Sequence, residues 1–185
     1  RLSNRAALQR YSAGSDACRY SGGNTTKSGA TLGWITSARD QYAVELLRRA
    51  LQERLEIGVV ASEVMHEAHA TEIRHPCETH KTQHLLVAQH STRDGAPMSA
   101  KAARRDRDRV LAEQLRSYGC GVLLLVGYMK IVTEILYDSW PTLNLHPAPP
   151  LGPVGKWEDV MWTLISVGAR YGGAMIHVTT AQMDR

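Results

Sequence analysis

A run of six residues without a polar member, GVLLLV at positions 121–126, restricts more than any other feature how this chain can fold. A strand with one face in solvent alternates apolar and polar residues, whereas an uninterrupted apolar strand must be covered on both faces. Such strands are typical of parallel sheets, in which crossover helices pack against each side. The run therefore predicts a central parallel strand, and it is far shorter than the roughly 18 residues of a membrane span.

Apolar runs and amphipathic segments alternate along the chain on either side of this run. Short strands are predicted at residues 30–35, 57–61, 84–88, 142–145 and 174–178. Helices are predicted at residues 42–51, 100–118, 131–137 and 157–165, and residues 62–83 and 91–100 are expected to be irregular. Because strands alternate with helices, we expect an α/β fold with an open, mostly parallel, doubly wound (Rossmann-like) sheet flanked by helices.

The first 29 residues differ in composition from the rest of the chain. They carry five basic residues and one acidic residue among abundant Ser and Gly. This composition predicts a solvated N-terminal extension at residues 1–29, with a transit peptide as the alternative. We expect a single α/β domain at residues 30–185, since 185 residues suffice for one domain with its own core.

Charge and cysteine content limit the partners that the chain could have. It has 22 Lys and Arg against 18 Asp and Glu, which is too small an excess to indicate nucleic acid but is compatible with an anionic small molecule. The charged run at residues 101–109 mixes both signs and is expected to be a solvated helix face. Three well-separated cysteines without metal or redox spacing favour a reducing compartment, here the cytoplasm.

Six histidines lie between His66 and His90 and raise the question of a metal site. His66 and His69 have helical spacing, but the sequence around them does not match the H-E-x-x-H pattern of zinc proteases. No cysteine or carboxylate framework completes a ligand set. We therefore expect no metal site.

Asn144 and His146 carry the clearest chemical signal in the chain. They end a short apolar run, and His146 directly precedes Pro147, so both lie at the carboxyl end of a predicted strand, where open α/β sheets bind ligands. Residues two apart on a strand point to the same face. An amide that donates a fixed hydrogen bond, next to an imidazole that moves a proton near neutral pH, suits a reaction in which a carbonyl oxygen becomes negative. The alternative is a structural histidine.

Three further segments are candidates for binding or catalysis. The turn at residues 36–40 (TSARD) follows the first predicted strand and could direct N–H groups at an anion, although Ser37 or Asp40 could instead cap the next helix. Residues 127–132 (GYMKIV) leave the central strand and could line a pocket or place Met129 and Ile131 in the core. His177 and Asp184, seven residues apart, could pair a base with a carboxylate.

Together these segments resemble the formyltransferases that use 10-formyltetrahydrofolate, above all the branch that formylates glycinamide ribonucleotide in purine biosynthesis. Residues 126–132 (VGYMKIV) resemble the A-G-[YF]-M-R-I-L motif of that family, and residues 143–148 (LNLHPA) resemble its N-I-H-P-S motif. Residues 176–184 resemble its V-H-F…[LV]-D motif, with the same gap from His177 to Asp184. The resemblance is loose over residues 30–185 and close over residues 119–185.

The resemblance implies roles for these residues. An amine would attack the formyl carbon, with Asn144 and His146 hydrogen-bonded to the oxyanion and Asp184 holding a water that carries the proton. The folate pocket would be bordered by Tyr128, Met129, Lys130, Ile131 and Val132. The acceptor would be bound by Ser37, Ala38, Arg39 and Asp40.

The resemblance also implies the partners. We expect 10-formyltetrahydrofolate as the co-substrate, a phosphorylated amine as the acceptor, a homodimer, and no nucleic acid or membrane. In that family the chain continues beyond the final Asp, so we expect the domain to be incomplete at its C-terminus.

Two loops depart from the family pattern. The family's G-x-G-S-N turn is replaced by TSARD at residues 36–40, which removes close backbone approach and places Asp40 against a phosphate, while Arg39 can offset this charge. The S-L-L-P-x-[FY]-x-G loop is replaced by APPLGPVG at residues 148–155. Three alternatives therefore stay open: a formyltetrahydrofolate hydrolase, a non-catalytic folate- or nucleotide-binding module, and a dinucleotide-dependent oxidoreductase without the glycine fingerprint.

Overall fold

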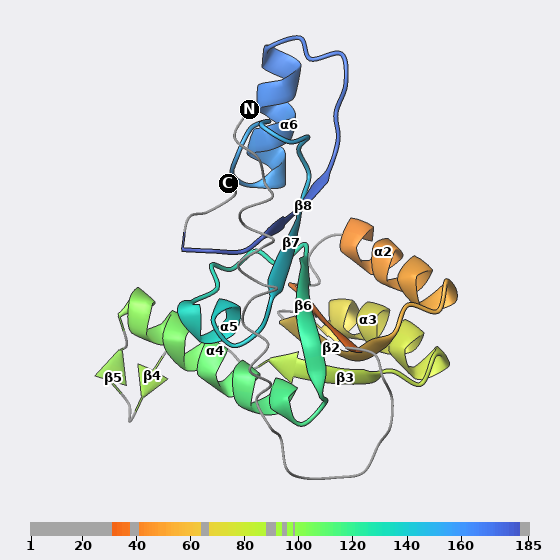
Figure 1. Ribbon diagram of the computed structural model, residues 1–185, viewed down its shortest axis with the longest axis vertical. Coiled ribbons are helices and arrows are strands. Elements are labelled where there is room, and N and C mark those ends of the chain that lie inside the picture. The colour runs from red at the N-terminus through yellow and green to blue at the C-terminus, as the bar shows by residue number, and fades with distance from the viewer. Residues whose placement is uncertain are drawn as a thin grey trace, which may run out of the picture.

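The computed structural model describes residues 31–37, 41–63, 67–87, 92–93, 96–97 and 99–181, and a six-stranded sheet forms its centre (Figure 1). The strand order is β3-β2-β1-β6-β7-β8. The strands are β1 (Thr31–Thr36), β2 (Ile57–Glu63), β3 (Gln83–Val87), β6 (Cys120–Val126), β7 (Thr142–His146) and β8 (Met175–Val178). β8 runs antiparallel to β7, and the other neighbours pair in parallel. The predicted open, mostly parallel sheet is confirmed.

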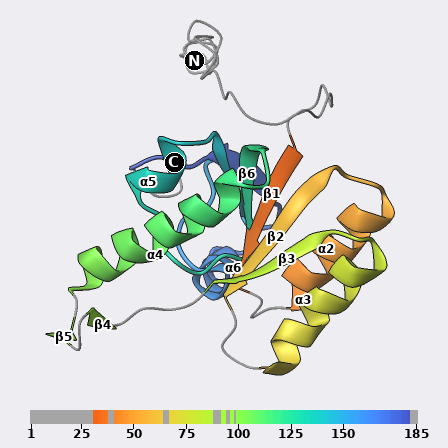
Figure 2. The same cartoon turned by 90° about the horizontal axis from the view of Figure 1, so that it is seen from below.

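Helices cover both faces of this sheet, as Figure 2 shows from below. On one face lie α2 (Gln41–Gln52) and α3 (Glu67–Thr79), and on the other lie α4 (Ala100–Arg116) and α5 (Glu134–Tyr137). In β6, Leu123 and Leu125 pack into the α4 side, whereas Leu124 and Val126 pack into the α2 side. This double coverage explains why the strand at 121–126 shows no polar alternation.

The structure differs from the predicted elements in three places. Residues 62–83 were expected to be irregular, yet they contain the end of β2 and the helix α3. Ile73 and Cys77, four residues apart, are fully buried against α2, and this packing sustains a helix despite the internal Pro76. Within residues 91–100, β4 (Thr92–Arg93) and β5 (Ala96–Pro97) form a small antiparallel ribbon. The third difference is α5, which begins at Glu134 rather than 131.

The order of the strands creates a topological switch point between β1 and β6. The chain adds β2 and β3 on one side of β1 and then returns through α4 to place β6 on the other side. Two bonds join the loops that follow these strands: Ser37 N–H donates to the Gly127 carbonyl at 3.2 Å, and Met129 N–H donates to Ser37 Oγ at 2.8 Å. Doubly wound sheets bind ligands outside the carboxyl ends of the strands at this point.

The last helix, α6 (Trp157–Ser166), lies beyond the end of the sheet at the top of Figure 1. It buries Val160 and exposes Trp162 and Ile165. No helix among the described ranges is long and apolar enough to span a lipid bilayer.

Candidate functional site

A cluster of three polar side chains lies where β7 pairs with β8. Asn144 and His177 are register partners across the two antiparallel strands, and Asn144 Nδ2 lies 3.1 Å from His177 Nε2. Because an amide nitrogen can only donate, His177 Nε2 accepts, and its Nδ1–H donates to the Val178 carbonyl at 3.3 Å. The His146 and His177 rings meet edge to face at a centroid distance of 6.2 Å. Asn144 and His146 therefore share one face, as the sequence predicts, and His177 lies beside both.

His146 is enclosed by the loop that follows β7. The imidazole is 3% exposed, and its Nε2–H donates to the Pro153 carbonyl at 2.9 Å. A tight turn shapes this loop, because Gly152 N–H donates to the Pro149 carbonyl at 2.8 Å. A Cβ at position 152 would lie 2.8 Å from that same oxygen, so only glycine fits without displacing the loop. The proline-rich segment that departs from the family pattern thus fixes the orientation of His146.

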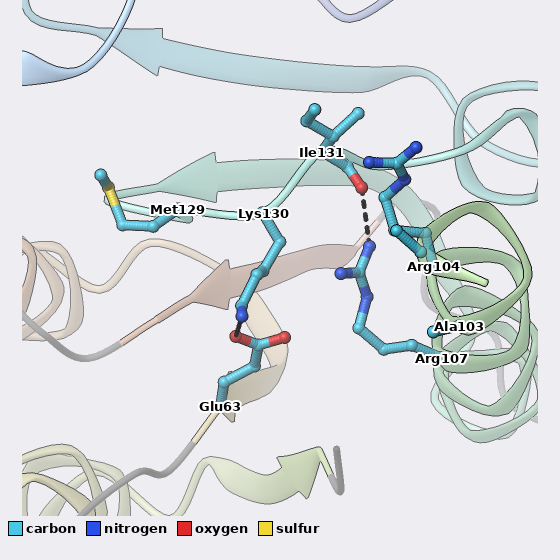
Figure 3. A pocket seen from close by; sticks show the side chains of 8 residues that line it. Glu63, Ala103, Arg104, Arg107, Met129, Lys130 and Ile131 are labelled. Atoms are coloured by element: carbon cyan, nitrogen blue, oxygen red, sulfur yellow. Dashed lines mark hydrogen bonds and ion pairs between the residues drawn. The ribbon is translucent and has the colours of Figure 1, made fainter. Parts of the chain in front are cut away.

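The loop that leaves β6 borders a cavity of about 350 Å³ on the α4 side of the molecule (Figure 3). Three of the five predicted folate-pocket residues line it: Met129, Lys130 and Ile131. The other two do not, because Val132 is packed in the core and the Tyr128 hydroxyl points to the Glu63 carboxylate at 3.5 Å. Residues from outside the loop complete the wall: Glu63, Ala100, Ala103, Arg104 and Arg107.

The charges around this cavity favour an anionic ligand. Arg104, Arg107 and Lys130 face it, against the single carboxylate of Glu63 among the lining residues. Glu63 is buried at the carboxyl end of β2, and its Oε2 lies 3.9 Å from Lys130 Nζ. Arg107 is paired with the buried Asp108, so two carboxylates face three cations and one net positive charge remains at the cavity.

Tyr128 contacts two of the charged residues that line this cavity, Glu63 and Arg107. Burial raises the pKa of its phenol, the nearby Glu63 and Asp108 raise it further, and Arg107 opposes them. The hydroxyl therefore stays protonated and donates to Glu63. This contact connects the loop after β6 to the end of β2.

Sequence reasoning missed Glu63, Arg104, Arg107 and Asp108. The predicted strand ended at residue 61, so Glu63 was not placed at the carboxyl edge of the sheet. The predicted solvated face at 101–109 is wrong for two of its residues: Arg107 is 7% exposed and Asp108 is fully buried. A signal was present, because Arg107 lies four residues before Leu111 and eight before Leu115, on the apolar stripe of the helix.

The remaining predicted site residues are only partly within the described chain. Ser37 is 2% exposed, and its hydroxyl accepts from Met129 N–H, so it joins the two loops at the switch point. Ala38, Arg39, Asp40 and Asp184 lie outside the described residues. The substrate contacts of these positions stay predictions. Within the described part of the chain, no three His, Cys, Asp or Glu side chains come together as a metal site would require.

Comparison with known proteins gives a consistent result. Residues 34–185 match the family model described as formyl transferase. A chloroplastic phosphoribosylglycinamide formyltransferase from Arabidopsis thaliana is 33% identical over 108 residues, which cover 52% of this chain and 37% of the plant protein. The matched part of the chain thus spans little more than a third of that curated relative.

Solved structures show the same fold. Glycinamide ribonucleotide transformylase 1 from Symbiobacterium toebii superimposes over 89% of this chain and 73% of its own, with a TM-score of 0.62 and 24% identity. A phosphoribosylglycinamide formyltransferase from Bacillus halodurans covers 84% of this chain and 74% of its own, with a TM-score of 0.64 and 15% identity. A formyltetrahydrofolate deformylase from Pseudomonas putida covers 87% and 53%, with a TM-score of 0.60 and 17% identity.

Proposed function

The chain belongs to the formyl transferase family, and on this premise we propose that it transfers the formyl group of 10-formyltetrahydrofolate to an amine. The observation that carries the proposal is the cluster of Asn144, His146 and His177 at the β7–β8 edge. Within this cluster, His146 directly follows Leu145, the register partner of Val126, so His146 lies beside the start of the loop at 127–133. In this proposal the cluster supplies a hydrogen-bond donor and an acid–base group, and the cavity beside Met129, Lys130 and Ile131 would bind the anionic donor molecule.

The proposed reaction forms one carbon–nitrogen bond and breaks another. The amine attacks the formyl carbon, and the carbonyl electron pair moves to oxygen. Collapse of this oxyanion releases the folate nitrogen, which takes up the proton lost by the amine. Asn144 would donate its second N–H to the oxyanion, and Asp184 would hold the water that carries the proton. Removing one such donor typically costs about 3–4 kcal/mol in the barrier.

His146 would supply a second hydrogen bond or proton to the oxyanion. In the structure its Nε2–H is donated to the Pro153 carbonyl. The proposal therefore requires the loop at 147–156 to release this N–H when the donor binds. Such loop movements are common in enzymes that exclude water from the reacting atoms.

We propose glycinamide ribonucleotide as the acceptor, bound through its phosphate by the turn at 36–40, with Arg39 as the cation. The names of the plant and bacterial relatives support this substrate, because they describe proteins that act on phosphoribosylglycinamide or glycinamide ribonucleotide. A cytoplasmic location and a homodimer are part of the same proposal.

A second candidate function is hydrolysis of 10-formyltetrahydrofolate, in which water replaces the amine. Two observations favour it: the turn at 36–40 lacks both glycines of the family's phosphate-binding turn, and the fold also matches a formyltetrahydrofolate deformylase. The two functions differ in their product, since hydrolysis releases formate and transfer yields a formylated amine.

The test is a turnover assay with 10-formyltetrahydrofolate, with and without glycinamide ribonucleotide. Loss of the formyl group from the folate is followed by absorbance, and the product is identified by mass spectrometry. We expect formylated glycinamide ribonucleotide from the unmodified chain and a rate at least a hundredfold lower from His146→Ala. His80→Ala, at an exposed histidine after α3, is the matched control and should keep the full rate. If the unmodified chain is no faster than His146→Ala, the proposal is wrong.

A further inference from the structure

We propose that Arg107 and Asp108 are positioning residues, which hold the loop at 128–133 in the shape that the donor site requires. This inference rests on the proposed function, because it assigns the cavity beside that loop to the formyl donor. Neither residue is expected to touch the reacting atoms. They would act through the backbone of Ile131 and Thr133.

The contacts of this pair reach the loop at three positions. Arg107 Nη2 donates to the Ile131 carbonyl at 2.7 Å, and Thr133 N–H donates to Asp108 Oδ2 at 2.6 Å. Arg107 Nε and Nη2 both donate to Asp108 Oδ1, at 2.8 and 2.7 Å, which holds the two side chains together. The guanidinium carbon also lies 5.8 Å from the centre of the Tyr128 ring. Figure 3 shows the Arg107 contact beside the cavity.

The loop needs such partners because it has no regular structure between the end of β6 and the start of α5. Buried backbone N–H and C=O groups outside helices and strands must find side-chain or water partners. The Thr133 amide and the Ile131 carbonyl find theirs on α4. The sequence predicted that this helix begins at residue 131. These bonds also explain why α5 begins at Glu134 instead.

Energy alone does not explain a buried pair at this position. Removing two charges from water costs desolvation free energy, which offsets much of the gain from their attraction. Apolar residues of similar size often stabilise a fold equally well. An apolar pair, however, could not bind a carbonyl and an amide at fixed positions. The bidentate fork of Arg107 and the second oxygen of Asp108 do so, and this specificity points to control of the loop's shape.

The test compares Arg107→Lys and Asp108→Asn with the unmodified chain in the turnover assay. Lysine keeps the charge but cannot bind Asp108 and Ile131 in a fork, and asparagine keeps the shape but loses one acceptor oxygen. We expect the KM for 10-formyltetrahydrofolate to rise about tenfold or more in both, since small misplacements of binding groups have large kinetic effects. The kcat and the KM for the acceptor should change by less than about threefold. Arg109→Lys, exposed on the same helix and paired with Asp106, is the control.

This pattern separates positioning from a purely structural role. A variant that only loses folded protein lowers the apparent kcat and leaves KM unchanged, because KM does not depend on the concentration of active enzyme. An unchanged donor KM in both folded variants would overturn the proposal. If the unmodified chain shows no turnover and no folate binding, the proposed function fails instead.

Hydrogen exchange on the unmodified chain gives a second test that does not depend on how the variants fold. The Thr133 amide is bonded to a buried carboxylate, so we expect it to exchange at least about a hundredfold more slowly than an exposed amide. Exchange at the rate of an exposed amide would show that Asp108 does not hold the loop and would overturn the proposal.

Discussion

Replacing His177 by alanine should slow formyl transfer only through its effect on Asn144. The Asn144 amide donates one hydrogen to His177 Nε2 at 3.1 Å, and this bond orients the second hydrogen toward the proposed oxyanion. A neutral hydrogen bond between half-buried side chains contributes about 0.5–1.5 kcal/mol. Since about 1.4 kcal/mol corresponds to a factor of ten, His177→Ala should lower kcat by about two- to tenfold.

Removing the amide itself should have a much larger effect. Asn144→Ala deletes the proposed oxyanion donor, for which a loss of about 10²–10³ in kcat is typical. In the double variant His177 has no amide left to orient. We therefore expect Asn144→Ala/His177→Ala to match Asn144→Ala within about a factor of two, which is complete coupling in a double-mutant cycle.

The assay is kcat under saturation with both substrates, measured for the four proteins of the cycle. His177→Gln serves as the conservative control, because its amide oxygen can accept from Asn144 and should recover part of the rate. Multiplicative losses in the double variant would refute the reasoning, since they would mean that His177 acts independently of Asn144.

Three predictions concern stability and reactivity. Gly33→Ala should lower the free energy of unfolding by about 1–3 kcal/mol in urea titrations, because a Cβ there would lie 2.7 Å from Cδ2 of the buried Leu123. Burial lowers the pKa of His84 below its ordinary 6.5, and Arg74 lowers it further, so the unfolded state takes up the proton first as the pH falls. The free energy of unfolding should thus decrease below about pH 6.5, and a His84→Gln variant should lose this component. Burial also raises the pKa of the Cys77 thiol to about 12, so iodoacetamide at pH 8 should modify Cys77 in the denatured protein but not in the native one, as peptide mass spectrometry would show.

Much of the fold was predictable because burial on two faces leaves a strong pattern in the sequence. The run at 121–126 forms most of β6, one of the two central strands, and the helix stripe at 42–51 corresponds to α2. The direction of β8 was not predictable, since side-chain alternation is the same in parallel and antiparallel strands. α3 was missed because few of its residues are apolar: Ala70, Ile73 and Cys77 are buried, but the polar residues between them and Pro76 weaken the periodic signal.

The candidate site was predictable where it depends on local order along a strand. Asn144 and His146 share a face because they lie two residues apart on β7. The contacts that hold the loop at 128–133 depend instead on residues 20 or more positions away, such as Arg107 to Ile131. The helical stripe with Leu111 and Leu115 indicates that Arg107 is buried, but not that its partners are Asp108 and the Ile131 carbonyl, since these depend on what the fold packs against the helix.

Two of the three cations beside the cavity, Arg107 and Lys130, differ in exposure and therefore respond differently to ionic strength. Arg107 and Asp108 are out of reach of counterions, whereas Lys130 is 31% exposed. Between 0.1 M and 1 M salt the Debye length falls from about 10 Å to about 3 Å, which weakens attraction at exposed charges and affects buried pairs far less. Salt should therefore weaken the attraction between Lys130 and an approaching anion. The loop at 128–133 should keep its conformation, because the Arg107–Asp108 pair that holds it is buried.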